Sequence, residues 1–155
     1  MPKTITLEEL KNYEGRELSP SDWIDITQER IDQFAHCTDD HQYIHVDPER
    51  MKDSPYRCTI AHGFLSLSLM AGHGPADWPE LENRVLSLNY GLDRVRFLQP
   101  VRVNSRVRFH TKIVSVREKS PGRVLIKSEK ILEIEGLGLD KPAMVAEALG
   151  MAVTK

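Results

Sequence analysis

The chain has 155 residues, with 21 Lys and Arg against 23 Asp and Glu and a formal net charge of −2. This length and near-neutral charge predict one domain over residues 1–155 and exclude a second full domain. Long basic blocks that could neutralise phosphates are missing from the sequence, so nucleic acid is not an expected partner.

The first residues and the cysteines bear on where the protein works. Residues 1–9 reach acidic side chains before an apolar segment can form, so no signal peptide is expected. The longest apolar stretch, residues 64–72, is about half of a ~20-residue membrane span. Cys37 and Cys58 form no CxxC motif and suggest no disulfide framework. We therefore expect a cytoplasmic protein without membrane contact.

The first half of the chain predicts short elements with polar connections. Thr6 and Glu9 have the spacing of a capping box, which starts a helix. Changes of hydrophobic period then give the other elements. In chain order we expect a helix from Thr6 to Gly15, a strand over residues 23–27, a helix over 31–37, a polar loop over 38–47 and a short helix from Pro48 to about Asp53.

The second half predicts one buried helix and a run of strands. Residues 60–72 are apolar on nearly every face, which indicates a helix buried on all sides. From Val85 onward the period changes to two, as in strands with one wet face. We expect two short strands over residues 85–90 and 94–97, a long strand over 101–113, and two more over 124–135 and 143–153, joined by a hairpin-type loop over 136–142. This order indicates an α+β fold with an antiparallel sheet wrapped round the helix.

The polar loop holds the densest group of titratable side chains in the chain. His36, His41 and His45 fall within ten positions, together with Asp39 and Asp40. A convergent Asp and His can move protons on and off water. The same residues can also serve the fold alone, because an Asp can cap a turn and a His can pack with its nitrogens hydrogen-bonded.

A metal site in this loop is not expected. His41 and His45 are four positions apart, a spacing that on a helix can bind a metal ion. However, Tyr43 and Ile44 together with the nearby Pro48 disfavour a regular helix there.

The entry to the buried helix, around Gly63, is a second candidate. Glycine lets a carbonyl group approach the backbone, and free amides at a helix N-terminus stabilise an oxyanion. Alternatively, Gly63 only relieves crowding where the helix meets the sheet. The residues alone leave both interpretations open.

Three segments together resemble a known family. They are Asp40-His41-Gln42-Tyr43-Ile44-His45, Ala61-His62-Gly63, and Leu92-Asp93-Arg94-Val95-Arg96-Phe97-Leu98-Gln99-Pro100-Val101. In order and spacing they resemble the MaoC-like dehydratases, which include the (R)-specific enoyl-CoA hydratases and nodulation protein N. The resemblance covers about Trp23 to Val153 and implies a hotdog fold, a long helix wrapped by an antiparallel sheet.

The family pattern Gly-Asp-x-Asn-Pro-(aliphatic)-His implies that Asp40 and His45 are the catalytic pair. This sequence departs from the pattern, because Asp39 replaces the Gly, Gln42 the Asn and Tyr43 the Pro. These departures are similar to the nodulation-protein-N branch and leave the pair intact.

The resemblance implies reversible addition of water to a trans-2-enoyl-CoA, with the Gly63 amide stabilising the charge on the thioester oxygen. It also implies substrate contacts from Gln42, Tyr43, His62, Arg94 and Arg96. Coenzyme A enters as part of the substrate and no cofactor or metal is required. The family covers its open sheet edge by pairing, so we expect a homodimer.

Two other functions fit the same resemblance. A hotdog acyl-CoA thioesterase would use the same thioester but hydrolyse its carbonyl with a lone carboxylate. A non-catalytic acyl-CoA binding protein is the third alternative, and retention of both Asp40 and His45 disfavours it.

Overall fold

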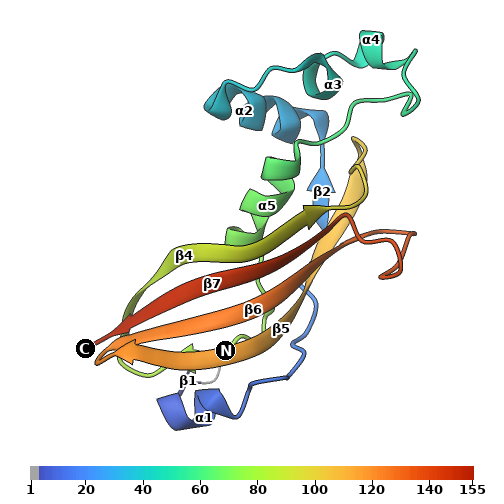
Figure 1. The fold of residues 1–155 in the computed structure, drawn as a ribbon. Coiled ribbons are helices and arrows are strands. Elements are labelled where there is room, and N and C mark those ends of the chain that lie inside the picture. The colour runs from blue at the N-terminus through green and yellow to red at the C-terminus, as the bar shows by residue number, and fades with distance from the viewer. Residues whose placement is uncertain (1–3) are drawn as a thin grey trace.

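The computed structural model describes residues 4–155 as one long curled sheet, one helix lying against it, and further helices at both ends (Figure 1). The elements, in chain order, are β1 (Thr4–Ile5), α1 (Leu7–Lys11), β2 (Ile24–Ile26), α2 (Gln28–Thr38), α3 (Tyr43–Val46), α4 (Pro48–Met51), α5 (Gly63–Gly72), β3 (Glu80–Leu81), β4 (Arg84–Phe97), β5 (Ser105–Ser120), β6 (Arg123–Ile134) and β7 (Met144–Thr154).

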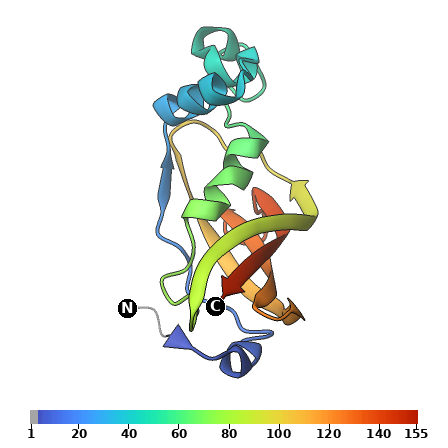
Figure 2. The same cartoon turned by 90° about the vertical axis from the view of Figure 1, so that its left-hand side faces the viewer.

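The main sheet has the strand order β2-β5-β6-β7-β4, and all of its pairs are antiparallel. Seen from the side, the sheet curls and α5 lies within its concave face (Figure 2). The expected α+β architecture, with an antiparallel sheet round a helix, is confirmed. The hairpin loop expected over residues 136–142 also joins β6 to β7 as predicted.

The two strands expected over residues 85–90 and 94–97 form one continuous strand. Residues 84–97 form the single strand β4, whereas the sequence predicts a break between residues 90 and 94. The pairing with β7 shifts register between Asn89 and Gly91 and again between Leu92 and Arg94. These irregularities bend the strand and interrupt its alternation without ending it.

The strand expected over residues 101–113 starts later and runs further, from Ser105 to Ser120. Val101 and Val103 bind a different partner, the segment before α5. The amide of Ala61 donates to the carbonyl of Val101 at 2.7 Å, and the amide of Val103 donates to the carbonyl of Thr59 at 3.0 Å. This ties the start of α5 to the sheet.

The prediction that residues 60–72 form a helix buried on all sides is wrong in two respects. The helix α5 begins at Gly63, and only one side of it is covered in the single chain. Leu65 and Ser66 are buried, whereas Phe64 is 68% exposed. The sheet curls round one face of the helix only, so Leu67, Leu69 and Met70 are half-buried against the core and Phe64 stays at the surface.

The short helices α1 and α4 form where their capping residues predict them, although their bounds differ from the predicted ones. The capping box of Thr6 and Glu9 is present, and Asp47 accepts the amide of Arg50 at 3.0 Å at the start of α4. Inside the expected polar loop the chain forms one extra helical turn, α3, closed by the amide of Asp47 donating to the carbonyl of Tyr43. The turn is too short for propensity to predict it.

The core has two parts. The larger packs α5 and α2 on the middle of the sheet, around Phe109, Leu132 and Met144. The smaller packs α1, β1 and β3 under the other end of the sheet, around Leu10 and Ile113. Over residues 4–155 every helix is too short or too polar to span a bilayer.

Candidate active site

Three elements meet at one end of the sheet and bring the candidate residues together. Helix α2 ends at Thr38, and the left-handed φ of 61° at the C-cap Asp39 turns the chain, so that Asp40 comes directly after the turn. His45 lies in α3, and His62 is the N-cap of α5. The site therefore combines residues 22 positions apart in the chain, joined by the hydrogen bond from His62 to the backbone of Asp40.

The ring of His45 is held by one backbone hydrogen bond. Its Nδ1 lies 2.6 Å from the carbonyl oxygen of Ile60. A carbonyl can only accept, so Nδ1 carries a hydrogen and donates it. In the neutral imidazole the other nitrogen, Nε2, then has a free lone pair and can accept a proton.

His62 contacts both the backbone of Asp40 and the ring of His45. Its Nε2 donates to the backbone carbonyl of Asp40 at 3.0 Å, and its ring stacks on that of His45 with centroids 3.8 Å apart. His62 is buried, and its Nδ1 has no hydrogen-bond partner within residues 4–155. It thus links the backbone before α3 to the ring inside α3.

Asp40 faces solvent beside this pair. One of its carboxylate oxygens accepts the amide of Gln42 at 3.3 Å, so it caps a turn as the structural interpretation expected. A carboxylate oxygen and one nitrogen from each of His45 and His62 all lie within 4.8 Å of one another. The capping role leaves the second oxygen for other contacts.

This cluster is poorly shaped for one metal ion. The rings of His45 and His62 are stacked at an interplanar angle of 23°, so their lone pairs lie in nearly parallel planes. A bound ion needs nitrogens that converge on it at about 2 Å. The cluster therefore suits proton transfer better than metal coordination.

The environment keeps His45 neutral. Burial lowers the pKa of its imidazole from the ordinary value of 6.5, and the neighbouring His62 lowers it further. The hydrogen bond to Ile60 and the charge of Asp40 act in the opposite direction but do not cancel the effect of burial. At neutral pH His45 is thus a base with a free nitrogen.

The N-terminus of α5 lies next to this group and has no side-chain cap. Its first amides, starting with Gly63, have no acceptor within the helix and carry partial positive charge. A Cβ on Gly63 would stand 3.2 Å from three ring atoms of Phe97. Space at this position is therefore tight, which is compatible with both the oxyanion and the packing interpretation.

The expected substrate contacts are spread more widely. Gln42 and Tyr43 lie at the start of α3, where the guanidinium of Arg50 covers the ring of Tyr43 at 3.5 Å from its centroid. Arg94 and Arg96 lie on exposed positions of β4 and alternate with Val95, which packs on the core. Both arginines thus point away from the α5 side of the sheet.

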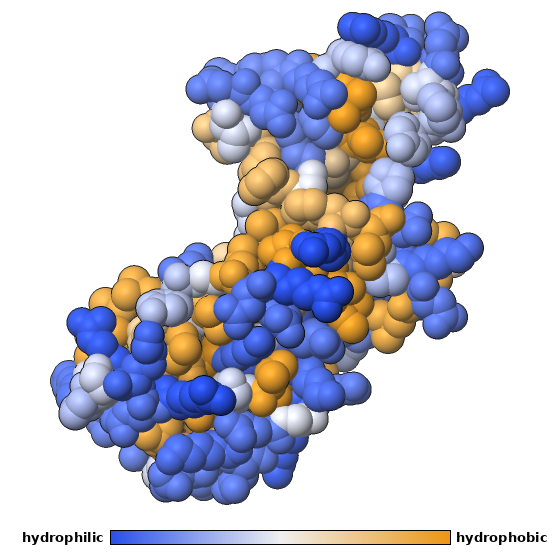
Figure 3. Space-filling view, viewed as in Figure 1, coloured by the Kyte–Doolittle hydropathy of each residue, from blue (hydrophilic) through white to orange (hydrophobic). Residues whose placement is uncertain are grey.

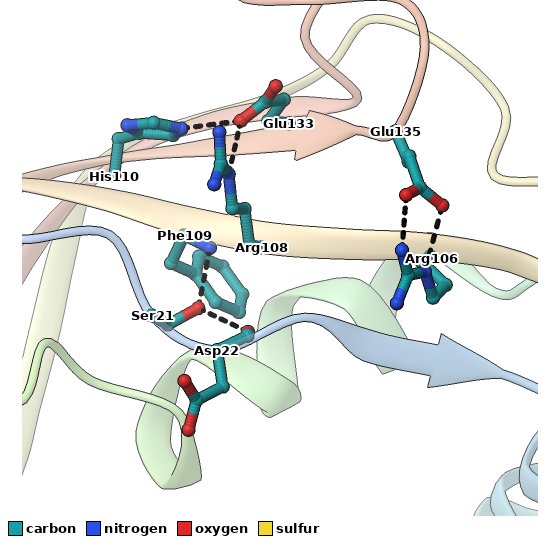
Figure 4. A network of polar contacts seen from close by, with 8 residues as sticks. All are labelled: Ser21, Asp22, Arg106, Arg108, Phe109, His110, Glu133 and Glu135. Carbon is teal, nitrogen blue, oxygen red and sulfur yellow. Dashed lines mark hydrogen bonds and ion pairs between the residues drawn. The ribbon is translucent and has the colours of Figure 1, made fainter.

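Two further arginines on the sheet already have partners (Figure 4). Arg106 binds the carboxylate of Glu135 with two nitrogens, and Arg108 binds Glu133 at 2.6 Å, as does His110. Their charges are neutralised on the outer face of β5 and β6. Arg94 and Arg96 form no ion pair within residues 4–155, but they point away from the side of the sheet on which α5 lies.

Residues 9–133 match the family described as MaoC like domain, which is most of the chain. The chain belongs to the MaoC-like dehydratase family. This membership places it among the hydro-lyases.

Individual relatives agree with this assignment. The chain is 42% identical over 142 residues to 3-hydroxyacyl-thioester dehydratase Z of Mycobacterium tuberculosis, covering 87% of each chain. It is 41% identical over 143 residues to nodulation protein N of Rhizobium leguminosarum, covering 92% of this chain and 88% of that one. The (R)-hydratase from A. caviae has the same fold, with a TM-score of 0.70, 21% identity, and 88% and 93% of the two chains covered. The hotdog fold is thereby confirmed.

In this MaoC-like dehydratase the structure adds one residue that the sequence did not single out. The side chain of Gln28 donates to the carbonyl of His45 at 2.8 Å and accepts the hydroxyl of Thr59. It thus ties α2 to both α3 and the segment before α5. No local pattern marks this glutamine, because its partners lie 17 and 31 residues further along the chain.

Proposed function

We propose that the protein is an (R)-specific enoyl-CoA hydratase, which reversibly adds water to trans-2-enoyl-CoA to give (R)-3-hydroxyacyl-CoA. The observation that carries this proposal is the pair of Asp40 and neutral His45 beside the uncapped start of α5. Hydration needs an acid-base pair and stabilisation of an enolate. The names of the dehydratase and (R)-hydratase relatives support the same reaction.

In the proposed mechanism one water molecule lies between Asp40 and His45. The free Nε2 of His45 takes a proton from this water as its oxygen bonds to the β-carbon of the substrate. The electron pair of the double bond moves toward the thioester oxygen, where the Gly63 amide stabilises the developing charge. Asp40 aligns the water and helps return the proton to the α-carbon, so the elements of water are added in full.

The substrate follows from the same assignment. Coenzyme A is part of the substrate, and the reaction needs no further cofactor or metal. Arg94 and Arg96 would bind its phosphates, while Gln42 and Tyr43 would contact the thioester side. His62 would act through Asp40 and His45, because its own ring is buried behind them.

The proposal includes a homodimer in the cytoplasm. Strand β4 has one neighbour, β7, and its other edge is open within the described sheet. Several of its large apolar side chains are exposed, and apolar surface gathers over the middle of the molecule in Figure 3, where Figure 1 shows β4 and α5. Both cysteines are free, as is usual in a reducing compartment.

The test is a hydration assay on a panel of enoyl-CoA lengths, followed at the enoyl absorbance with chiral analysis of the product. Asp40→Asn and His45→Gln should each lower kcat by roughly 10² or more, the usual range of acid-base contributions. Matched controls exist in the same loop. Asp39→Asn and His41→Gln should keep wild-type rates, because Asn tolerates the left-handed backbone of residue 39.

Three outcomes would contradict the proposal. Release of thiol from saturated acyl-CoA, with no hydration, would identify a thioesterase. Binding of enoyl-CoA without turnover would identify a carrier or scaffold. Normal turnover of a folded Asp40→Asn or His45→Gln variant would remove that residue from the mechanism.

A further inference from the structure

Lys130 is a buried cation that forms no ion pair within residues 4–155. It lies on the concave face of β6 and is 7% exposed. Its Nζ donates to the hydroxyl of Thr111 at 3.0 Å and stands 5.4 Å from the ring centroid of Trp78. Burial lowers the pKa of its ammonium from 10.5 to about 8. At neutral pH the group is therefore mostly charged and lacks a counter-ion.

This amine lines a cavity of about 330 Å³. The cavity lies between the C-terminal end of α5, the segment leading to β3, and strands β4, β6 and β7. Its volume is at the lower end of the range for small-molecule sites. Most of its wall is apolar, including Met70, Trp78, Leu81, Ile126 and Met151.

The polar part of the wall includes Lys130 and a few uncharged side chains. Ser128 precedes Lys130 by two positions on the same face of β6, and Ser87 and Asn89 come from β4. The other charged residues of the wall are Glu80 and Arg84, and they pair with each other at 3.6 Å. Lys130 is thus the one cation of this wall without an anionic partner among the described residues.

The cavity continues toward the proposed catalytic site. A second hollow of about 270 Å³ shares five wall residues with it, namely Met70, Ala71, Asn89, Ala148 and Leu149. This second hollow reaches Leu67, one helical turn after Gly63. The two hollows together follow α5 from its second turn, at Leu67, to its C-terminal end.

The sheet register gives the distance between the start of α5 at Gly63 and the amine of Lys130. Phe97, which touches Gly63, pairs with Met144, whereas Lys130 belongs to the next inward-facing row. Lys130 is therefore about 7 Å along the strands and about 10 Å across two strands from Phe97. An extended acyl chain bound at Gly63 can span this separation.

We propose that Lys130 selects acyl groups with a carboxylate at their distal end, so that the preferred substrate is an ω-carboxy-2-enoyl thioester. This inference rests on the proposed hydratase function and names its substrate class. The methylenes would pack on the apolar wall and the carboxylate would pair with Lys130 and Ser128. A methyl-terminated chain would instead displace water from an unpaired ammonium, which is costly.

The alternative is that Lys130 only serves the fold through Thr111 and Trp78. A structural lysine would affect stability but would not affect discrimination between two chain ends. The decisive measurement is therefore a ratio of kcat/KM values for two trans-2-enoyl-CoA substrates of equal length, one ending in a carboxylate and one in a methyl group, compared at several lengths.

The wild-type enzyme should prefer the carboxylate-terminated substrate by roughly 10- to 100-fold, the range for a hydrogen bond to a charged group. Lys130→Met should lose this preference, and Lys130→Gln provides a second variant if Met does not fold. Lys127→Met is the matched control. It removes a lysine of the same strand whose Nζ pairs with Asp93 and Glu147 on the outer face, so its ratio should match wild type.

Binding separates this proposal from the hydratase proposal. Calorimetry with saturated ω-carboxyacyl-CoA needs no turnover and should show tighter binding than with saturated acyl-CoA of equal length, in wild type but not in Lys130→Met. If neither enoyl substrate is hydrated but this difference is present, only the hydratase function fails. If wild type hydrates methyl-terminated substrates equally well or better, or if Lys130→Met and Lys130→Gln keep the wild-type ratio, the role of Lys130 is overturned.

Discussion

His45 meets a structural and a chemical requirement with different atoms. Its Nδ1 satisfies the carbonyl of Ile60, which fixes the ring and the tautomer. This bond leaves Nε2 unprotonated in the neutral ring, as a base requires. A packed histidine and a reactive histidine are therefore compatible here, because the two uses need different ring nitrogens.

The pH dependence of hydration should reflect this burial. Because burial lowers the pKa of His45, kcat/KM should fall on the acid side with a midpoint below 6.5. Activity is lost as pH falls through that midpoint, where the imidazole becomes charged. In Asp40→Asn the residual activity should show a lower midpoint, since the charge of Asp40 raises the pKa of His45.

The check is a pH profile of kcat/KM, with circular dichroism over the same range to confirm that the fold persists. A midpoint at or above 6.5 in the wild type would contradict the assignment of His45 as the base.

The burial of Lys130 predicts how the stability of the fold depends on pH. Its pKa of about 8 in the folded chain lies below 10.5, so between these values the unfolded chain binds more protons. Stability should therefore rise as pH increases from 8 toward 10.5. Burying the charge at pH 7 costs about 3 kcal/mol, at about 1.4 kcal/mol per pKa unit. Lys130→Met should thus unfold at a higher temperature than wild type at pH 7, and the difference should shrink near pH 10.

Thermal unfolding of both proteins across this pH range measures the effect. The loss of the bond to Thr111 opposes part of the gain. A destabilised Lys130→Met with no dependence on pH would show that the lysine is chiefly a packing and hydrogen-bonding residue.

The sequence could indicate Asp40 and His45 because their chemistry and spacing lie within one short segment. The structure brings them together as that pattern predicted. It could not indicate Gln28 or Lys130, because their roles depend on partners from distant segments. His62 illustrates the limit, since its motif was visible but its stacking on His45 depends on how α3 folds.

Among the elements, the first turn of α5 permits the clearest test. Gly63→Ala adds one methyl group that would meet the ring of Phe97 at 3.2 Å. If the Gly63 amide binds the thioester oxygen, this methyl should push the carbonyl away and lower kcat more than it raises KM. The loss of one such donor typically costs about 3 to 4 kcal/mol. Melting temperature and kcat must be measured on the same preparation.

A double variant separates chemistry from packing. Gly63→Ala with Phe97→Leu removes ring atoms that crowd the new methyl, so the melting temperature should recover part of any loss while kcat stays low. A Gly63→Ala protein with a lowered melting temperature and an unchanged kcat would remove this amide from the mechanism.

The elements themselves were predictable where the pattern was long or the capping residues were specific. Strands β6 and β7 and the box of Thr6 and Glu9 fall close to their expected places. The predicted break in β4 does not occur, because register shifts against β7 accommodate the residues that interrupt the alternation. Such shifts depend on the partner strand and cannot be predicted from β4 alone. The prediction that α5 is buried on all sides was wrong for a related reason. Apolar side chains indicate that a face of the helix will be covered, but they do not indicate whether the same chain or a second chain covers it.

At the scale of the whole molecule, the β4 side of the sheet is left uncovered by the described helices. Helices α2, α3 and α4 gather at one end, and α1, β1 and β3 lie at the other (Figure 1). Neither group covers β4. The open edge of this strand and the exposed Phe64 of α5 leave apolar surface that a monomer in water would not retain without function.

We expect this surface to be the interface of the homodimer, with the two β4 strands adjacent. Light scattering at micromolar concentration should give a mass of about two chains of 17.7 kDa each. Leu88→Lys adds a charge at a β4 position that is 51% exposed, so it should reduce the mass to one chain without affecting the core. Val114→Lys is the matched control on β5, where the side chain is 39% exposed, and it should remain a dimer. A wild-type mass of one chain, or a Leu88→Lys protein that still dimerises, would show that β4 is not the interface and that the apolar surface of β4 and α5 has another partner.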